Sequence, residues 1–288
     1  KNQPRQSMEC RLLLLDIDSN KLIEQSIQYL RVMSWNILAR GATEHQFVPR
    51  QSENEGQTQN RYNKIMVQIV GKNPDIVLLQ EVDYIFYMTF KLKYWKNYDI
   101  IFTQFPGNKV PRESFGTAII FKKGKFKNKI TYEYIDSLER EDYGYKNALI
   151  LSLRDNRNRH MVFVSTHISG TRLKCAENLL KKISEKLKQY RDCPIVVMGG
   201  DLNCNLNRYE EVTHECSTMI SSVVDEDMGL IPGDTVTPAI STCSFDYSSP
   251  KEEALIDRIY YTSNIIKLDY FVDRTMECVD KKIWDNKS

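Results

Sequence analysis

The sequence contains no apolar run long enough to cross a membrane. A transmembrane helix needs roughly 18 or more consecutive apolar residues. The run Leu12–Leu15 is short and is followed at once by Asp16. We therefore expect neither a membrane partner nor a secretory leader.

Cysteines with a metal-binding or redox spacing are also missing. The seven cysteines are scattered, their number is odd, and no Cys-x-x-Cys occurs. This pattern argues against a disulfide framework and against a cysteine-rich zinc site. It is typical of free thiols in a reducing compartment, so we expect the protein in the cytoplasm, with mitochondria as the alternative.

Several catalytic signatures are absent. There is no Gly-x-x-x-x-Gly-Lys-Ser/Thr, no Gly-x-Gly-x-x-Gly, no Gly-x-Ser-x-Gly and no His-Glu-x-x-His. Their absence argues against P-loop nucleotide hydrolysis, dinucleotide-dependent redox chemistry, α/β-hydrolase chemistry and zinc-protease chemistry. The net charge of +2 permits a phosphate-bearing partner without requiring a nucleic acid.

What is present is the pattern of one sizeable globular domain. The chain of 288 residues is 41% hydrophobic and 27% charged, and no repeat or linker divides it. Apolar runs predict strands at 12–15, 30–36, 74–81, 98–102, 116–121, 147–153, 161–166, 195–198, 255–261 and 268–271, with a hairpin between 147–153 and 161–166. Helical spacing predicts helices at 61–72, 82–97, 176–190 and 205–222, and polar loops at 40–60 and 232–250.

Two other patterns are interpreted structurally. The spacing of Tyr84, Tyr87, Met88 and Lys91 indicates core packing of a helix rather than a binding stripe. The lysines between 122 and 129 indicate a solvated turn and an edge strand protected by charge against aggregation, rather than a phosphate track.

Polar residues follow four of the predicted strands. Asn36, Glu81 and His167 each end a strand, and Gly199-Gly200 is followed by Asp201 and Asn203. Ligands of sheet-centred folds bind beyond strand ends, so we expect these side chains to converge.

The residue types then narrow the chemistry. Glu81 and Asn36 offer oxygen ligands suited to Mg²⁺, with Mn²⁺ as the alternative. His167 can donate to a phosphate oxygen, Asp201 can orient or deprotonate a water, and Asn203 can hold that water or the scissile oxygen. Together they predict metal-assisted phosphoester hydrolysis.

Further residues are candidates for the site. Asp257 lies within an apolar strand, where a carboxylate is costly unless it is paired, so we expect it to pair with a neighbouring cation or to orient a histidine. The loop aromatics Phe245 and Tyr247 are candidates for stacking on exposed bases. Arg112, in a Pro- and Gly-containing loop, and Arg172 are candidate substrate-binding cations.

At these positions the chain resembles the endonuclease/exonuclease/phosphatase superfamily. The matching segments, in the family's order, are Ser34-Trp35-Asn36-Ile37-Leu38-Ala39, Leu79-Gln80-Glu81-Val82-Asp83, Ser165-Thr166-His167, Gly200-Asp201-Leu202-Asn203 and Ile256-Asp257-Arg258-Ile259-Tyr260. The resemblance implies a four-layer α/β sandwich, in which two packed mixed β-sheets are flanked by helices, and a divalent-metal phosphoesterase.

Carried over by position, the family's roles fall on the same residues. The resemblance makes Asn36 and Glu81 metal ligands, His167 a transition-state donor, and Asp201 and Asn203 the pair that positions water. It also implies that Asp257 orients a terminal histidine that contacts the scissile phosphate.

The branch that the sequence resembles suggests the substrate. The segments "LQEVDYIF" and "CPIVVMGGDLN" are similar to the deadenylase-like branch, which includes nocturnin and the Angel proteins, and the region after His167 also resembles the tyrosyl-DNA phosphodiesterase branch. We therefore expect a Mg²⁺-dependent 3′–5′ exoribonuclease that acts, as a monomer, on the 3′ end of RNA. The alternative is a nocturnin-like phosphatase that removes the 2′-phosphate of NADP(H), although Glu253 stands where nocturnin has a basic residue.

The sequence departs from the family at its end. No histidine follows Asp257, so either the domain ends short of its last strand or the terminal histidine is missing. In the second case the chain would be a catalytically impaired binding module. We expect residues 1–29 to be an N-terminal extension and residues 30–288 to be the catalytic domain.

One N-terminal segment resembles an unrelated family. Leu12–Leu15 followed by Asp16-Ile17-Asp18 resembles the nucleophile motif of haloacid-dehalogenase-type phosphatases. Asn20 departs from that motif, and a strand followed by a polar turn is the simpler interpretation.

Overall fold

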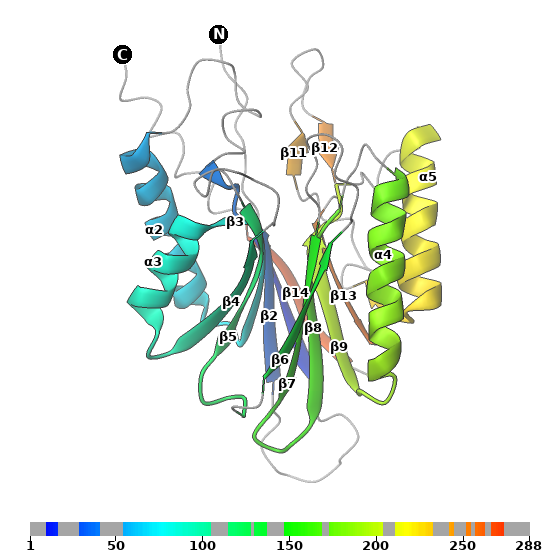
Figure 1. Ribbon diagram of the computed structural model, residues 1–288, viewed down its shortest axis with the longest axis horizontal. Helices are drawn as coiled ribbons and strands as arrows, with labels where there is room; N and C mark the ends of the chain where they lie inside the picture. The colour runs from blue at the N-terminus through cyan, green and yellow to red at the C-terminus, as the bar shows by residue number, and fades with distance from the viewer. Residues whose placement is uncertain are drawn as a thin grey trace.

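The computed structural model describes residues 10–16, 29–40, 54–104, 115–127, 130–136, 147–168, 173–203, 211–232, 242–244, 252–254, 257–262 and 266–273. Within these ranges the chain forms two six-stranded sheets, one two-stranded sheet and four α-helices (Figure 1).

The first large sheet has the order β14-β1-β2-β3-β5-β4. Its strands are β1 (Cys10–Asp16), β2 (Tyr29–Asn36), β3 (Ile76–Asp83), β4 (Tyr98–Gln104), β5 (Phe115–Lys122) and β14 (Ile266–Asp273). Only β2 and β3 run parallel among its paired strands, and α2 (Glu55–Lys72) connects them. The following helix, α3 (Tyr84–Tyr94), leads from β3 to β4.

The second large sheet has the order β10-β13-β9-β8-β7-β6. Its strands are β6 (Thr131–Asp136), β7 (Asn147–Arg154), β8 (His160–His167), β9 (Ile195–Asp201), β10 (Leu230–Pro232) and β13 (Asp257–Thr262). Here β8 and β9 form the parallel pair, connected by α4 (Leu173–Leu187) and the short 3₁₀ turn Lys188–Tyr190. Next come α5 (Glu211–Ile220) and the π-helical turn Ser221–Asp227, while β11 (Thr242–Ser244) pairs with β12 (Glu252–Ala254).

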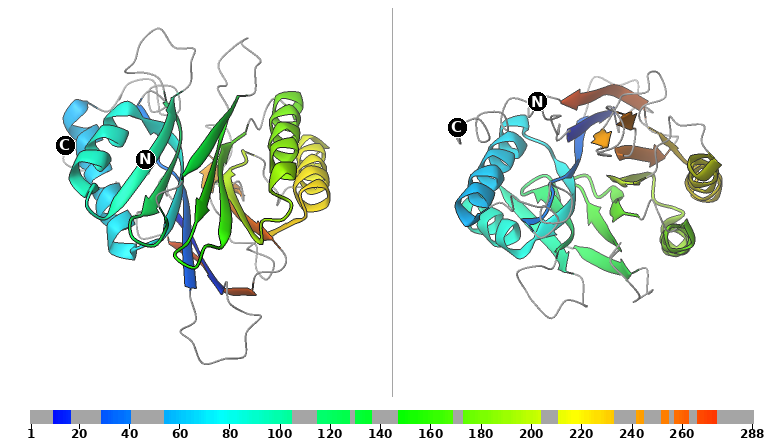
Figure 2. Two further views of the ribbon diagram at one scale, coloured as in Figure 1. Left: turned by 60° about the horizontal axis from the view of Figure 1, so that its bottom comes forward. Right: turned by 90° about the horizontal axis from the view of Figure 1, so that it is seen from above.

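The two sheets pack face to face, and helices cover their outer faces (Figure 2). One apolar cluster, which includes Leu78 and Phe163, lies between the sheets. A second cluster joins the first sheet to α2 and α3, and a third joins the second sheet to α4 and the π-helical turn. These three apolar layers separate four layers of secondary structure, so the predicted four-layer α/β sandwich of mixed sheets is confirmed.

The alternation of side chains explains why both faces of each sheet are apolar. In β3, Ile76 and Leu78 belong to the cluster between the sheets, whereas Val77 and Leu79 belong to the cluster under α2 and α3. A strand buried on both faces reads as a continuous apolar run, which is how β3, β7 and β9 read in the sequence.

The start of α2 corrects the sequence-based boundary. Residues 40–60 were expected to form a loop and the helix to begin at Arg61, but α2 begins at Glu55. Asn54 caps it: the Asn54 side chain accepts a hydrogen bond from the Gln57 backbone amide, and the Gln57 side chain accepts one from the Asn54 amide. This reciprocal cap stabilises a polar first turn that lacks apolar periodicity.

Other boundaries differ by smaller amounts. β3 continues to Asp83 and α3 occupies only Tyr84–Tyr94 of the helix expected at 82–97. The loop expected at 232–250 contains β11. No helix in the described ranges is long and apolar enough to span a membrane.

β1 brings part of the N-terminal region into the first sheet. It pairs antiparallel with β2 on one side and with β14 on the other. Residues 10–16 are thus hydrogen-bonded into the sandwich, while the domain boundary at residue 30 stays a prediction. Asp16 pairs with Tyr29, at the opposite end of β2 from Asn36, so the Asp16-Ile17-Asp18 motif begins away from the other candidate residues.

Two adjacent glycines in β9 differ in the space around them, which gives a first test of the fold. A Cβ on Gly200 would lie 1.9 Å from the backbone carbonyl oxygen of Thr166, so β8 and β9 would have to separate. We expect Gly200→Ala to lower the free energy of unfolding by about 3 kcal/mol or more, because backbone atoms cannot move aside. A Cβ on Gly199 would meet mainly the flexible end of Leu78, at 2.7 Å, so Gly199→Ala is the matched control and should cost about 1 kcal/mol. Thermal unfolding midpoints of the two variants check this, and equal midpoints would contradict it.

His160, at the start of β8, gives a pH dependence. Its Nε2 lies 2.6 Å from the Ser152 hydroxyl, and burial, with a smaller contribution from Arg154, lowers the pKa of the imidazole. Below the unfolded pKa of about 6.5 the unfolded chain therefore binds more protons than the folded one, so stability falls as the pH drops through this value. We expect His160→Gln, which keeps a polar side chain near Ser152, to flatten the loss of stability between about pH 7 and pH 5. Urea unfolding at each pH measures this; identical slopes in both proteins would refute it.

Candidate active site

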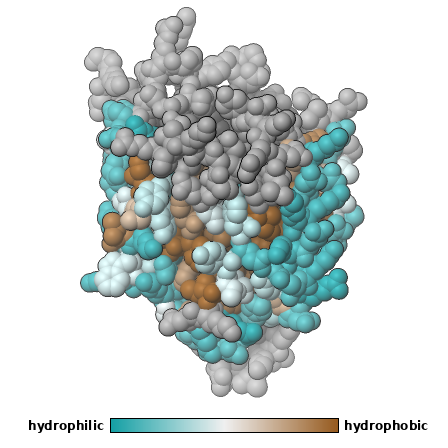
Figure 3. All heavy atoms as spheres, viewed as in Figure 1, coloured by the Kyte–Doolittle hydropathy of each residue, from teal (hydrophilic) through white to brown (hydrophobic). Residues whose placement is uncertain are grey.

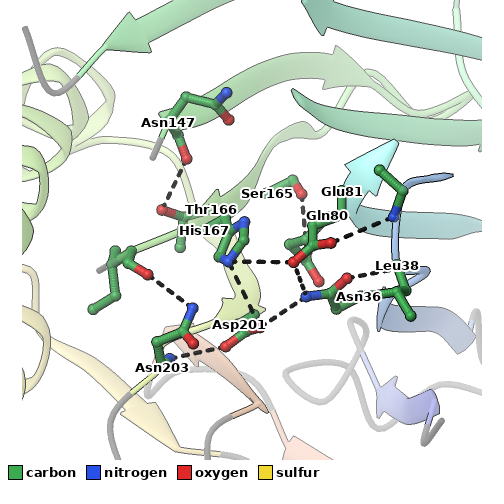
Figure 4. A network of polar contacts seen from close by, with 12 residues as sticks. Asn36, Leu38, Gln80, Glu81, Asn147, Ser165, Thr166, His167, Asp201 and Asn203 are labelled. Carbon is green, nitrogen blue, oxygen red and sulfur yellow. Dashed lines mark hydrogen bonds and ion pairs between the residues drawn. The ribbon is translucent and has the colours of Figure 1, made fainter. Parts of the chain in front are cut away.

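Four polar side chains meet at the carboxyl ends of the two parallel strand pairs (Figure 4). Asn36 ends β2 and Glu81 lies near the end of β3, in the first sheet. His167 ends β8 and Asp201 ends β9, in the second sheet, where they are register partners. The expected convergence of these residues is therefore observed.

A β-bulge aims Glu81 at the site. The register between β3 and β5 shifts between Leu79 and Val82, and Glu81 has a φ of 54°. Leu79 and Val82 both face the helices, so the bulge leaves Glu81 free to turn toward the second sheet. Bulges commonly re-aim a side chain in this way next to active sites.

The Asn36 carboxamide links the two sheets. Its Nδ2 donates to Glu81 Oε1 at 3.1 Å and to Asp201 Oδ2 at 2.8 Å. Its Oδ1 accepts the Leu38 backbone amide at 3.0 Å, which fixes the orientation of the amide. Ala39 completes the support by donating its backbone N–H to Glu81 Oε2 at 3.3 Å.

Asp201 and Asn203 form a matching turn on the second sheet. Asp201 Oδ1 accepts the Asn203 backbone amide at 2.8 Å, and Asn203 has a φ of 48°. The Asn203 side chain donates to the Ile168 carbonyl at 3.0 Å, and the Ile168 amide donates to the Asp201 carbonyl. The side-chain amide of Asn203 is thus tied to the chain that leaves β8.

His167 faces both carboxylates. Its Nε2 lies 3.9 Å from Glu81 Oε1 and 3.7 Å from Asp201 Oδ2. All three side chains are buried, and only 3–4% of the surface of each residue is exposed. Two carboxylates held this close in a buried setting need a positive partner, because an unpaired buried charge is costly.

The site has the geometry of a metal-binding cluster. Ligand atoms of Glu81, His167 and Asp201 all lie within 4.8 Å of one another, so the three residues could hold one ion. The carboxylate oxygens suit Mg²⁺ and Mn²⁺. Asn36, a predicted ligand, turns its nitrogen toward the carboxylates, so here it positions Glu81 and Asp201; its role as a ligand stays a prediction.

Asp257 is placed by its backbone alone. It begins β13 and is the register partner of Asp201 across the antiparallel β9–β13 pair. Its role in orienting a histidine stays a prediction. The predicted substrate-binding residues Arg112, Arg172, Phe245 and Tyr247 lie outside the described residues.

The sequence did not predict Asn147 as a residue of the site. It begins β7 and is the antiparallel register partner of His167, so the two side chains share the face that looks toward the first sheet. Asn147 is 2% exposed, and its Oδ1 has no hydrogen-bond partner within the described part of the chain. A signal was available, because the predicted hairpin already placed Asn147 across from the end of β8.

Ser165 and Gln80 join the sheets directly behind the site. Gln80 Nε2 donates to Ser165 Oγ at 3.1 Å, and that hydroxyl donates to the Leu79 carbonyl at 2.9 Å. These buried contacts fix the spacing between β3 and β8, and therefore between Glu81 and His167.

Solved structures with the same fold span a range of phosphoesterases. The catalytic domain of human nocturnin with bound sulfate is 18% identical, with 88% of this chain and 85% of that chain covered and a TM-score of 0.59. TDP2 of D. rerio, complexed with a single-strand DNA product, is 17% identical, with 81% and 84% covered and a TM-score of 0.57. A mannosyl-6-phosphatase of Bacteroides thetaiotaomicron is 15% identical, with 81% and 85% covered and a TM-score of 0.58. No curated protein sequence matches the chain significantly.

The sequence itself carries the assignment to a family. The profile of the Endonuclease/Exonuclease/phosphatase family matches residues 33–275, a range that includes every residue of the site in Figure 4. The chain therefore belongs to this family, whose members are hydrolases that act on phosphoester bonds.

Proposed function

We propose that the chain is a divalent-metal-dependent phosphodiesterase that removes nucleotides from the 3′ end of RNA. The observation that carries the proposal is the convergence of Glu81, His167 and Asp201, all buried, from the ends of two different sheets. Carboxylates and an imidazole in this arrangement offer what metal-assisted phosphoester hydrolysis needs.

Each residue of the site has a task in this reaction. Glu81, with Asn36 as the predicted second ligand, would hold a divalent cation, and the bound ion would supply Lewis-acid polarisation of the phosphate. Asp201 orients the attacking water and accepts its proton, since its Oδ2 is turned toward the other site residues. His167 Nε2 donates to a non-bridging phosphate oxygen as negative charge builds there.

RNA is proposed as the substrate on the strength of the sequence motifs. The segments around Glu81 and Asp201 resemble the deadenylase-like branch, and nocturnin, with which this chain shares its fold, belongs to that branch. The fold also occurs in a sugar phosphatase and in a protein solved with a DNA product, so the assay must offer more than one kind of phosphoester.

We expect the purified chain with Mg²⁺ to shorten a single-stranded RNA with a 3′-poly(A) end by release of AMP, and Glu81→Gln to abolish this release. The substitution removes one carboxylate charge and so weakens the hold on the cation. Mass spectrometry of a mixture that contains the RNA and NADPH follows both substrates at once. Glu226→Gln, on the exposed π-helical turn, is the matched control and should leave activity unchanged.

Two results would contradict the RNA assignment. Conversion of NADPH to NADH without AMP release would make the chain a nocturnin-like 2′-phosphatase. AMP release that persists undiminished in Glu81→Gln, or in excess EDTA, would show that the metal-centred site does not carry the reaction.

Asn147 is expected to hold substrate rather than to support the fold. Because its buried Oδ1 has no partner among the described residues, we expect Asn147→Ala to leave the unfolding midpoint unchanged or slightly raised. The same substitution should lower kcat/KM about 2- to 12-fold, the value of one neutral hydrogen bond to a substrate donor. Asn156→Ala, in the exposed β7–β8 turn, is the control. A lower midpoint with unaltered kcat/KM would make Asn147 a structural residue.

A further inference from the structure

The outer face of α3 is unexpectedly aromatic and basic. The spacing of Tyr84 and Lys91 suggested core packing, but Tyr84 is 49% exposed and Lys91 is exposed, as is Trp95, 57% exposed, at the end of the helix. At 100° per residue these three side chains fall within a narrow arc, opposite the buried Phe86 and Phe90. We call Tyr84, Lys91 and Trp95 the α3 stripe.

The stripe begins close in sequence to the candidate active site. Tyr84 follows Glu81 by three residues, and α3 then leads away from the end of β3 (Figures 1 and 2). From Tyr84 to Trp95 the helix rises about 16 Å, which equals about five nucleotides at ~3.4 Å for each nucleotide.

Lysine ammonium groups accompany the rings. Lys91 Nζ lies 5.3 Å from the centroid of the Tyr87 ring and donates to the Tyr87 hydroxyl. Lys96 Nζ and Lys123 Nζ lie 5.9 and 5.8 Å from the centroid of the Trp95 ring. Figure 3 shows hydrophilic and more apolar side chains mixed on the surface over α3, at the left.

These positive charges are available to a polyanion. Residues 84–97 contain three lysines and no acidic residue. Lys91 donates to a hydroxyl, and Lys123 donates to the Trp95 carbonyl at 2.6 Å, so both contacts are with neutral oxygens. Neither contact neutralises the positive charge of the lysine ammonium group.

We propose that the α3 stripe, with Lys96 and Lys123, binds the single-stranded body of a polynucleotide whose 3′ end lies in the active site. Bases stack on exposed aromatic rings without regard to sequence, and nearby lysines follow the phosphates, which is how single-strand binders work. The proposal rests on the proposed function, because it requires a polynucleotide whose 3′ end binds at Glu81, His167 and Asp201.

Nucleic acid is favoured over an anionic membrane by the layout of the stripe. Its two rings, Tyr84 and Trp95, lie at opposite ends of α3, with Lys91 between them and Lys96 against Trp95. A membrane-binding face would instead need apolar side chains gathered at one level, with the basic residues around them.

The test measures binding separately from turnover. Fluorescence anisotropy in EDTA compares RNA oligonucleotides of about 4 and about 12 nucleotides, the shorter of which does not reach Trp95 from the site. We expect Trp95→Ala to weaken binding of the longer RNA by about 5- to 150-fold and to leave the shorter one unaffected, whereas Tyr84→Ala should weaken binding of both. Tyr132→Ala, 59% exposed on β6, is the matched control and should change neither affinity.

Salt dependence tests the lysines. Lys91→Gln and Lys123→Gln should each reduce the slope of log K against log salt concentration by about 0.7, the value for one phosphate contact of a single strand. A purely structural role of these lysines would leave the slope unchanged, and so would overturn this part of the proposal.

Other outcomes overturn the stripe without touching the proposed function. Equal affinities of Trp95→Ala, Tyr84→Ala and the Tyr132 control for the longer RNA would do so, even if all of them still hydrolyse a dinucleotide. Binding of phosphatidylserine vesicles through Trp95, without binding of RNA, would identify the face as a membrane contact instead. Conversely, RNA binding that depends on the stripe in a chain that hydrolyses no phosphodiester would retain the stripe and refute the proposed enzyme.

Discussion

The structure depends on one side chain that joins the ends of its two sheets. The Asn36 carboxamide donates to Glu81 of its own sheet and to Asp201 of the facing sheet, and a backbone amide two residues later holds its oxygen. An amide can do this because it carries two donor hydrogens on one nitrogen and no charge. An aspartate at position 36 would add a third buried carboxylate, and an aliphatic residue would leave both existing ones without this donor. The spacing of the two carboxylates is therefore set by a neutral residue.

The two halves of the site are built by the same local device. In each sheet the one parallel pair is connected by a helix, and in each a polar residue at a strand end accepts the backbone amide two positions later: Leu38 for Asn36 and Asn203 for Asp201. The carboxyl ends of parallel neighbours lie side by side, so each pair delivers two residues to one edge. Two such edges facing each other produce the site, and Gly200 of β9 permits the close approach of β8 on which this depends.

The sequence was informative wherever structure is local. Apolar runs ending on Asn36, Glu81, His167 and Asp201 indicated strands, and the polar residues that ended them indicated the site. The bulge at Glu81 could not be predicted, because it depends on the partner β5, and strict alternation would have turned Glu81 toward the helices. The first turn of α2 was missed because a capping interaction, rather than apolar periodicity, stabilises it. The spacing of Tyr84 and Lys91 predicts core packing, but the two residues are exposed. Spacing alone cannot distinguish the two faces of a helix that carries aromatic residues on both.

Non-glycine residues with a positive φ mark the positions where the backbone conformation lowers the stability of the fold. Among the described residues, the non-glycine residues with positive φ include Asn73 at the end of α2 and Asn158 in a hairpin turn, where asparagine tolerates this conformation. Leu38 and Glu81 have no such tolerance, and each costs about 1–2 kcal/mol in a left-handed conformation. Both lie against Asn36, one through its backbone amide and the other through its carboxylate. Strain and buried like charges thus coincide at one point, and neither stabilises the sandwich. Unfavourable backbone conformations and buried like charges persist at one point only where the surrounding structure enforces them. Their presence here is explained if the geometry serves the binding of a cation and a phosphate rather than folding.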